Sequence, residues 1–115
     1  MAQFDVHRNA GKQKEAIPYV VIVQSSLFDN YRRRVVVPLV RRSNLTSAAS
    51  LAPAASLVDL PLNPVFIVEG VEVVLHPLEL VSVATEQLGA RVTSLAQEGD
   101  RIVSALDELL TRAWT

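Results

Sequence analysis

The sequence predicts a mainly β fold closed by one C-terminal α-helix. Two observations support this: β-branched runs recur between residues 17 and 84, and helical periodicity appears only after residue 100. The chain has 115 residues, of which 50% are apolar and 20% are charged. A chain of this size can bury a genuine core, so residues 1–115 are expected to form a single domain. Several strands and one helix favour a small, strongly bent sheet or half-barrel.

The first two strands are expected near the N-terminus. Residues 3–7 alternate polar and apolar side chains, as a strand with one buried face does. A polar stretch containing Gly11 then predicts a hairpin loop. The second strand, residues 17–23, is almost continuously apolar, which is typical of a strand covered on both faces. Pro18 should lie at its start or on an edge, because proline lacks a backbone donor.

A third strand is expected over residues 34–40, after a loop over residues 25–33. Pro38 within this run predicts an edge strand or a bulge, because it cannot donate to a central ladder. Residues 43–61 are rich in serine and alanine and are interrupted by prolines. They predict a short helical turn and a loop.

The second half of the sheet begins with a predicted hairpin. Two β-branched runs, 65–68 and 71–75, flank a two-residue connection that contains the glycine a tight turn requires. Further short strands are expected at 80–84 and 88–92. The strands are therefore expected to extend from about residue 3 to about residue 92.

The C-terminal helix is expected over residues 101–113. Asp100 is suited to accept hydrogen bonds from the unpaired backbone N–H groups at its start. Arg112 in the last turn faces the negative end of the helix dipole. The apolar residues expected on one stripe are Ile102, Leu106, Leu109, Leu110 and Ala113.

Composition excludes several classes of function. The net charge of −1 does not indicate broad attraction to nucleic acid, and the lack of cysteine excludes disulfides and thiolate metal sites. The N-terminus lacks the apolar core of a signal peptide, and the longest apolar run, residues 16–23, is too short to cross a bilayer. We therefore expect a cytoplasmic protein. His7 and His76 lie in no known catalytic motif, so neither catalysis nor a cofactor is predicted.

Arginines crowd the start of the third predicted strand. Arg32, Arg33 and Arg34 precede it, and Arg41 and Arg42 follow it. Guanidinium groups in such a cluster can clamp a phosphate or an acidic peptide. They can equally cap and solubilise an edge strand. The residues alone leave both interpretations open.

Trp114 is the single tryptophan of the chain and its next-to-last residue. Chain ends are usually poorly ordered, and an exposed tryptophan lowers solubility. This residue either folds back onto the domain or anchors a partner, because tryptophan is enriched among binding hot spots.

The central block of the chain resembles a known family. It contains, in order, PY, VQS, LFDN, an arginine run and VVVPL. The opening AQF, a later LVSV and a terminal helix ending near a tryptophan occur in the same order. This pattern resembles the CcdB family of toxins from toxin–antitoxin pairs, and the resemblance is weakest over residues 43–61.

This resemblance implies a homodimer with an SH3-like barrel, of the type shared with MazF-like ribonucleases, and a C-terminal helix. It also implies binding to the A subunit of DNA gyrase, which traps the cleaved-DNA state while the toxin itself breaks no bond. The family's C-terminal tryptophan, here Trp114, stacks on a gyrase arginine through a cation–π contact. The resemblance places the neighbouring Thr115 and the loop residues Ser25, Leu27 and Phe28 against gyrase as well.

Toxins of the family are neutralised by a cognate antitoxin whose disordered C-terminal segment folds onto the toxin. Such segments are commonly acidic, so some of Arg32, Arg33 and Arg34 are expected to pair with its carboxylates while the others support the strand and the dimer. Two alternatives stay open. One is a MazF-like ribonuclease, which needs an acid–base set in a basic groove. The other is a non-toxic member that retains antitoxin binding, because Thr115 stands where the family pattern has Gly-Ile.

Overall fold

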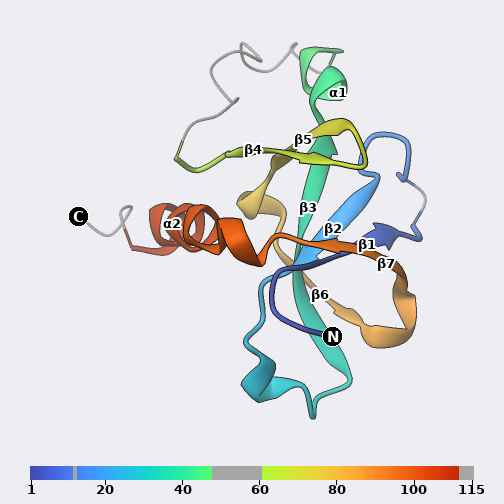
Figure 1. Ribbon diagram of the computed structural model, residues 1–115, viewed down its shortest axis with the longest axis vertical. Helices are drawn as coiled ribbons and strands as arrows, with labels where there is room; N and C mark the ends of the chain where they lie inside the picture. The colour runs from blue at the N-terminus through green and yellow to red at the C-terminus, as the bar shows by residue number, and fades with distance from the viewer. Residues whose placement is uncertain (12, 48–60, 112–115) are drawn as a thin grey trace.

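The computed structural model describes residues 1–11, 13–47 and 61–111. Within these ranges, a seven-stranded antiparallel sheet is closed by a helix (Figure 1). The strands are β1 (Asp5–Asn9), β2 (Tyr19–Ile22), β3 (Arg33–Arg41), β4 (Val65–Val68), β5 (Val71–Leu75), β6 (Val81–Ala84) and β7 (Leu88–Ser94). The helices are α1 (Arg42–Ser47) and α2 (Gly99–Leu110). Short 3₁₀ turns cover Ser26–Phe28, Pro77–Glu79, Thr85–Gln87 and Ala96–Glu98.

The sheet curls into a half-barrel around β3. The strands follow the order β4-β5-β3-β2-β1-β7, and β6 pairs with β3 beside this path. The first half of β3 therefore pairs with β6 and the second half with β5. The predicted mainly β fold with a C-terminal helix is confirmed, and the curled sheet is consistent with an SH3-like barrel (Figure 1).

Pro38 lies neither on an edge strand nor at a bulge of the β2–β3 ladder, so the prediction of an edge or a bulge was wrong. It lies inside the nine-residue strand β3, paired with β2 on one side. On the other side, the ladder to β6 ends at Val36 and the ladder to β5 begins at Leu39. The Pro38 carbonyl accepts a hydrogen bond from the His76 N–H on that side, at 3.1 Å. In an antiparallel strand, the backbone N and the carbonyl of one residue point toward the same neighbouring strand. The N–H that Pro38 lacks would therefore face the place where β3 changes its partner from β6 to β5, so no ladder hydrogen bond is lost there.

The predicted β1–β2 hairpin is confirmed, although β1 begins at Asp5. Phe4 adopts a φ of +71°, which interrupts an extended strand. Both faces of β1 are covered, because Asp5 and His7 are buried together with Val6. On its side away from β2, β1 pairs with β7, and the Gly89 carbonyl lies 2.9 Å from the His7 Nδ1 atom.

The β4–β5 hairpin has the predicted two-residue turn. Glu69 and Gly70 take φ values of +51° and +77°, as a type I′ turn requires. The short helix expected within residues 43–61 is present as α1, and residues 48–60 lie outside the described ranges. The strands expected at 80–84 and 88–92 correspond to β6 and β7.

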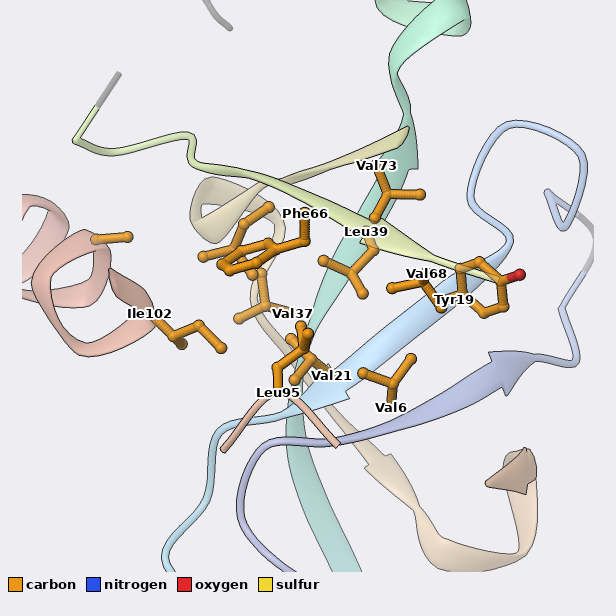
Figure 2. Packing of buried hydrophobic residues seen from close by; sticks show 12 residues of the cluster. Val6, Tyr19, Val21, Val37, Leu39, Phe66, Val68, Val73, Leu95 and Ile102 are labelled. Carbon is orange, nitrogen blue, oxygen red and sulfur yellow. The ribbon is translucent and has the colours of Figure 1, made fainter. Parts of the chain in front are cut away.

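The hydrophobic core lies between the concave face of the sheet and α2. Figure 2 shows Ile102 of α2 directed toward Phe66 and Val37 of the sheet. Both Ile102 and Ala105 are fully buried. The buried cluster is formed by Val6, Tyr19, Val21, Val37, Leu39, Phe66, Val68, Val73, Leu75, Leu95, Ile102 and Ala105.

The helix α2 differs from its prediction at both ends. It starts at Gly99, directly after a 3₁₀ turn, and its N-cap residue Glu98 makes no side-chain capping bond. The prediction that Asp100 caps the helix was therefore wrong, because Asp100 lies within the first turn. Leu110, predicted on the apolar stripe, is 69% exposed. Residues Arg112 and Ala113 lie outside the described ranges.

The orientation of α2 depends on close contacts at its first turn. A Cβ atom on Gly99 would lie 2.7 Å from the Phe4 ring, so a larger residue at this position would force the ring to shift. The Arg101 guanidinium lies 4.6 Å from the centroid of the Phe66 ring, and its Nη2 donates to the Val65 carbonyl at 3.0 Å. These contacts join α2 to the N-terminal segment and to β4. No helix in the described ranges is long and apolar enough to cross a membrane.

Candidate functional site

The loop of residues 24–32 connects β2 to β3 and projects from the end of the molecule opposite α1 (Figure 1). Ser25 begins its 3₁₀ turn, because the Ser25 hydroxyl accepts a hydrogen bond from the Leu27 N–H at 3.2 Å. The Phe28 N–H donates to the Ser25 carbonyl at 3.0 Å, and the Tyr31 N–H donates to the Phe28 carbonyl at 3.2 Å. The loop therefore has a defined internal conformation.

Three large apolar or aromatic side chains of the 24–32 loop face solvent. Leu27 is 84% exposed, Tyr31 is 66% exposed and Phe28 is 51% exposed. The rings of Phe28 and Tyr31 lie 6.4 Å apart and are tilted by 40°. Exposed apolar side chains that gather in one place are typical of an interaction site. Tyr31 was missed in the sequence, although its position between Asn30 and Arg32 already placed an aromatic residue in this loop.

Arg34, in contrast to its neighbours, is buried beneath the loop. Only 6% of it is exposed. Its Nη1 donates to the carbonyls of Tyr31 and Arg33 at 2.5 and 2.9 Å. Its Nη2 donates to the Asp29 carbonyl at 3.0 Å, and its Nε lies 3.6 Å from Asp29 Oδ1. The guanidinium is thus used for support inside the loop.

Arg32 and Arg33 are both exposed. Arg33 donates from Nε to the Ser82 hydroxyl at 2.9 Å and from Nη2 to the Ser82 carbonyl at 2.6 Å, which ties the start of β3 to β6. The Arg32 side chain has no hydrogen bond or ion pair among the described residues, while its carbonyl accepts from the Thr85 N–H at 2.9 Å. Of the three arginines in the run, Arg32 is therefore the most available to an acidic partner.

The predicted site residues divide into two groups. Ser25, Leu27 and Phe28 come together with the arginine run in the 24–32 loop and the first residues of β3. Trp114 and Thr115 lie outside the described residues.

A second polar cluster joins β1 and β2 to the β4–β5 turn. The Tyr19 hydroxyl donates to Glu69 Oε1 at 2.5 Å, and Arg8 Nη2 donates to Glu69 Oε2 at 2.9 Å. The hydrogen bond from Tyr19 and the nearby Arg8 charge lower the pKa of the Glu69 carboxyl. Burial and the Glu69 carboxylate raise the pKa of the Tyr19 hydroxyl. Each carboxylate oxygen already has a donor, so this cluster closes the β4–β5 hairpin onto β1 and β2.

This closure predicts an acid-dependent loss of stability. The folded protein lowers the pKa of Glu69 below its ordinary value of 4.5, so the unfolded chain binds more protons in that pH range. The contribution of Glu69 is present above that value and is lost as the pH falls through the lowered pKa. The urea midpoint of the parent should fall more between about pH 6 and about pH 3 than the midpoint of Tyr19→Phe. Equal falls in the two proteins would contradict this prediction.

Among residues 1–11, 13–47 and 61–111, no group of three or more His, Cys, Asp or Glu side chains is placed to hold a metal ion. A comparison with protein families gives a match to one family model, described as CcdB protein, over residues 3–111. No curated protein matches the chain. The family match covers the loop, the whole described sheet and α2.

Proposed function

The chain belongs to the CcdB family of toxins from toxin–antitoxin pairs, and we propose that it binds the A subunit of DNA gyrase and traps the complex in which the DNA is cleaved. The observation that carries this proposal is the exposure of Leu27 and Phe28, which occupy the loop positions implied to face gyrase. A protein of this kind acts by differential affinity, because it stabilises one state of another enzyme. Gyrase itself cleaves the DNA, and the toxin breaks no bond. Because gyrase acts on DNA inside the cell, the proposal places the toxin in the cytoplasm.

Two further elements complete the proposed complex. Trp114 stacks on an arginine of gyrase, a cation–π contact worth about 0.5–2 kcal/mol according to its desolvation. Thr115 and Ser25 border the same contact surface. The proposed toxin enters the central cavity of gyrase as a homodimer, which presents two copies of each loop.

A ribonuclease function is less well supported by the geometry. Such an enzyme needs a carboxylate or another base that reaches its substrate. Glu69 is held beside Arg8 and Tyr19, but both of its oxygens already accept hydrogen bonds within the protein. Its lowered pKa also makes it a weaker base. This cluster therefore favours a structural role over catalysis.

The proposed function is tested by a DNA-cleavage assay with purified gyrase and ATP. Cleaved DNA should accumulate with the parent protein. With Trp114→Ala, the concentration needed should rise by at least about 30-fold, because an anchor tryptophan contributes about 2 kcal/mol or more. Ile67→Ala is the control, because Ile67 is a large apolar side chain of β4 that is 69% exposed and has no part in the proposed contact. A folded parent that traps no DNA would contradict the proposal.

We also propose that Arg32 and Arg33 bind carboxylates of the cognate antitoxin. Both guanidinium groups reach solvent beside the exposed 24–32 loop. Arg34, the third arginine of the run, is turned inward and uses its charge near Asp29. An acidic antitoxin segment would therefore approach the outer two arginines.

A further inference from the structure

The interior of the 24–32 loop is polar. Three carbonyl groups of residues 29, 31 and 33 point inward to the Arg34 guanidinium. Gln24 closes the loop from its other end, since its Nε2 donates to the carbonyls of Phe28 and Arg33 at 3.1 and 3.3 Å. The Val35 N–H in turn donates to Gln24 Oε1 at 3.1 Å. Two side chains thus hold the backbone of the loop by six hydrogen bonds.

This arrangement explains why the apolar side chains face outward. The space beneath the loop is occupied by a charged guanidinium and by carbonyl groups, which offer no apolar contacts. Leu27, Phe28 and Tyr31 therefore remain exposed, although burying them inside the domain would be favourable. The hydrogen bonds of Arg34 and Gln24 thus hold the loop in a conformation that leaves these three side chains exposed.

Arginine is specifically suited to this support. Its planar guanidinium carries five N–H donors in a fixed arrangement, so one side chain reaches several carbonyls at once. Lysine has a single ammonium group on a flexible stem, and methionine has no donor. Either replacement would leave inward-facing carbonyls without a partner.

We propose that Arg34, together with Gln24, is a positioning residue that presets the 24–32 loop for its partner. This inference rests on the proposed function, in which the loop contacts gyrase. A preset loop binds more tightly because its backbone and side chains lose less freedom on association. Arg34 would thus control gyrase affinity without touching gyrase.

The test uses the full chain with Arg34→Met, Arg34→Lys or Gln24→Ala. Gln24→Ala tests the same idea with less risk to folding, because Gln24 is only half-buried. Its truncation removes hydrogen bonds to the loop without leaving a buried charge unpaired. Amide hydrogen exchange over residues 26–32 should accelerate at least tenfold in each variant. The protein concentration that gives half-maximal DNA trapping should rise at least tenfold, which corresponds to about 1.4 kcal/mol.

Two reference variants separate positioning from general stability. Arg41→Met removes a guanidinium–carbonyl bond, to Glu15, at the other end of the same strand, and should change neither readout. Leu27→Ala should weaken trapping while the loop amides exchange at the parent rate. That pattern distinguishes a contact residue from a positioning residue.

Unchanged loop exchange in Arg34→Met and Gln24→Ala would overturn the proposal. A loosened loop with trapping within twofold of the parent would overturn it as well. A parent protein that traps no DNA overturns the proposed function, and the exchange rates then decide the role of Arg34 in presetting the loop.

Discussion

Reversing two charges, as Arg32→Glu with Arg33→Glu, is expected to weaken the affinity for the antitoxin C-terminal segment by about 100-fold, or about 2.7 kcal/mol. Both side chains are exposed, so carboxylates of an acidic segment can approach them. The substitution removes two attractions and replaces them with repulsion between like charges. Titration calorimetry with the antitoxin segment at low salt measures the change.

The matched control reverses Arg41 and Arg42 at the other end of β3. This control makes the same change in net charge on a pair of neighbouring arginines, but it lies away from the 24–32 loop. Arg33 also bonds to Ser82, so urea unfolding of both double variants is compared. Equal loss of antitoxin affinity in the two proteins would indicate a general effect of charge and contradict the local role.

Truncating Ile102 to alanine is expected to lower the free energy of unfolding by about 2–5 kcal/mol. Ile102 is fully buried and is directed from α2 into the sheet toward Phe66 and Val37 (Figure 2). Its truncation removes apolar contacts and leaves a cavity in a core that relaxes only incompletely. Urea denaturation followed by circular dichroism measures the loss.

Val103 on the same helix supplies the comparison. It is 45% exposed, so Val103→Ala should change the free energy of unfolding by about 0.5 kcal/mol or less. If both substitutions had the same effect, α2 would not be held mainly by its buried face. Gyrase trapping by the Ile102→Ala protein, assayed below its unfolding midpoint, should decline only in proportion to the folded fraction.

The arginine run shows what a sequence pattern can and cannot predict about individual side chains. The sequence predicted that some of the three arginines pair with antitoxin carboxylates and that the others support the strand, but it did not show which residue takes which role. The structure separates them, because β-strand alternation and the path of the loop turn Arg34 inward while Arg32 and Arg33 face solvent. The exposed Tyr31 was missed for a related reason, since exposure within a loop depends on what fills the space beneath it.

The helix stripe shows the same limit. Helical periodicity correctly predicted a C-terminal helix with Ile102 on its buried side. The buried face in fact includes Ala105, whereas Leu110 is exposed. Periodicity predicts which residues share one face of a helix, but it does not show which of them another element covers.

Local patterns by themselves determined the approximate positions of the strands, the two-residue length of the β4–β5 turn and the presence of α2, because periodicity and turn chemistry depend on consecutive residues. The family resemblance was likewise visible in one continuous block. The tertiary structure alone decided that Pro38 lies in a central strand, where β3 changes from β6 to β5. It alone decided that Arg34 supports the loop from within. The pairing of Pro38 and the burial of Arg34 both depend on which distant segments of the chain contact each other. Neighbouring residues in the sequence do not determine these contacts.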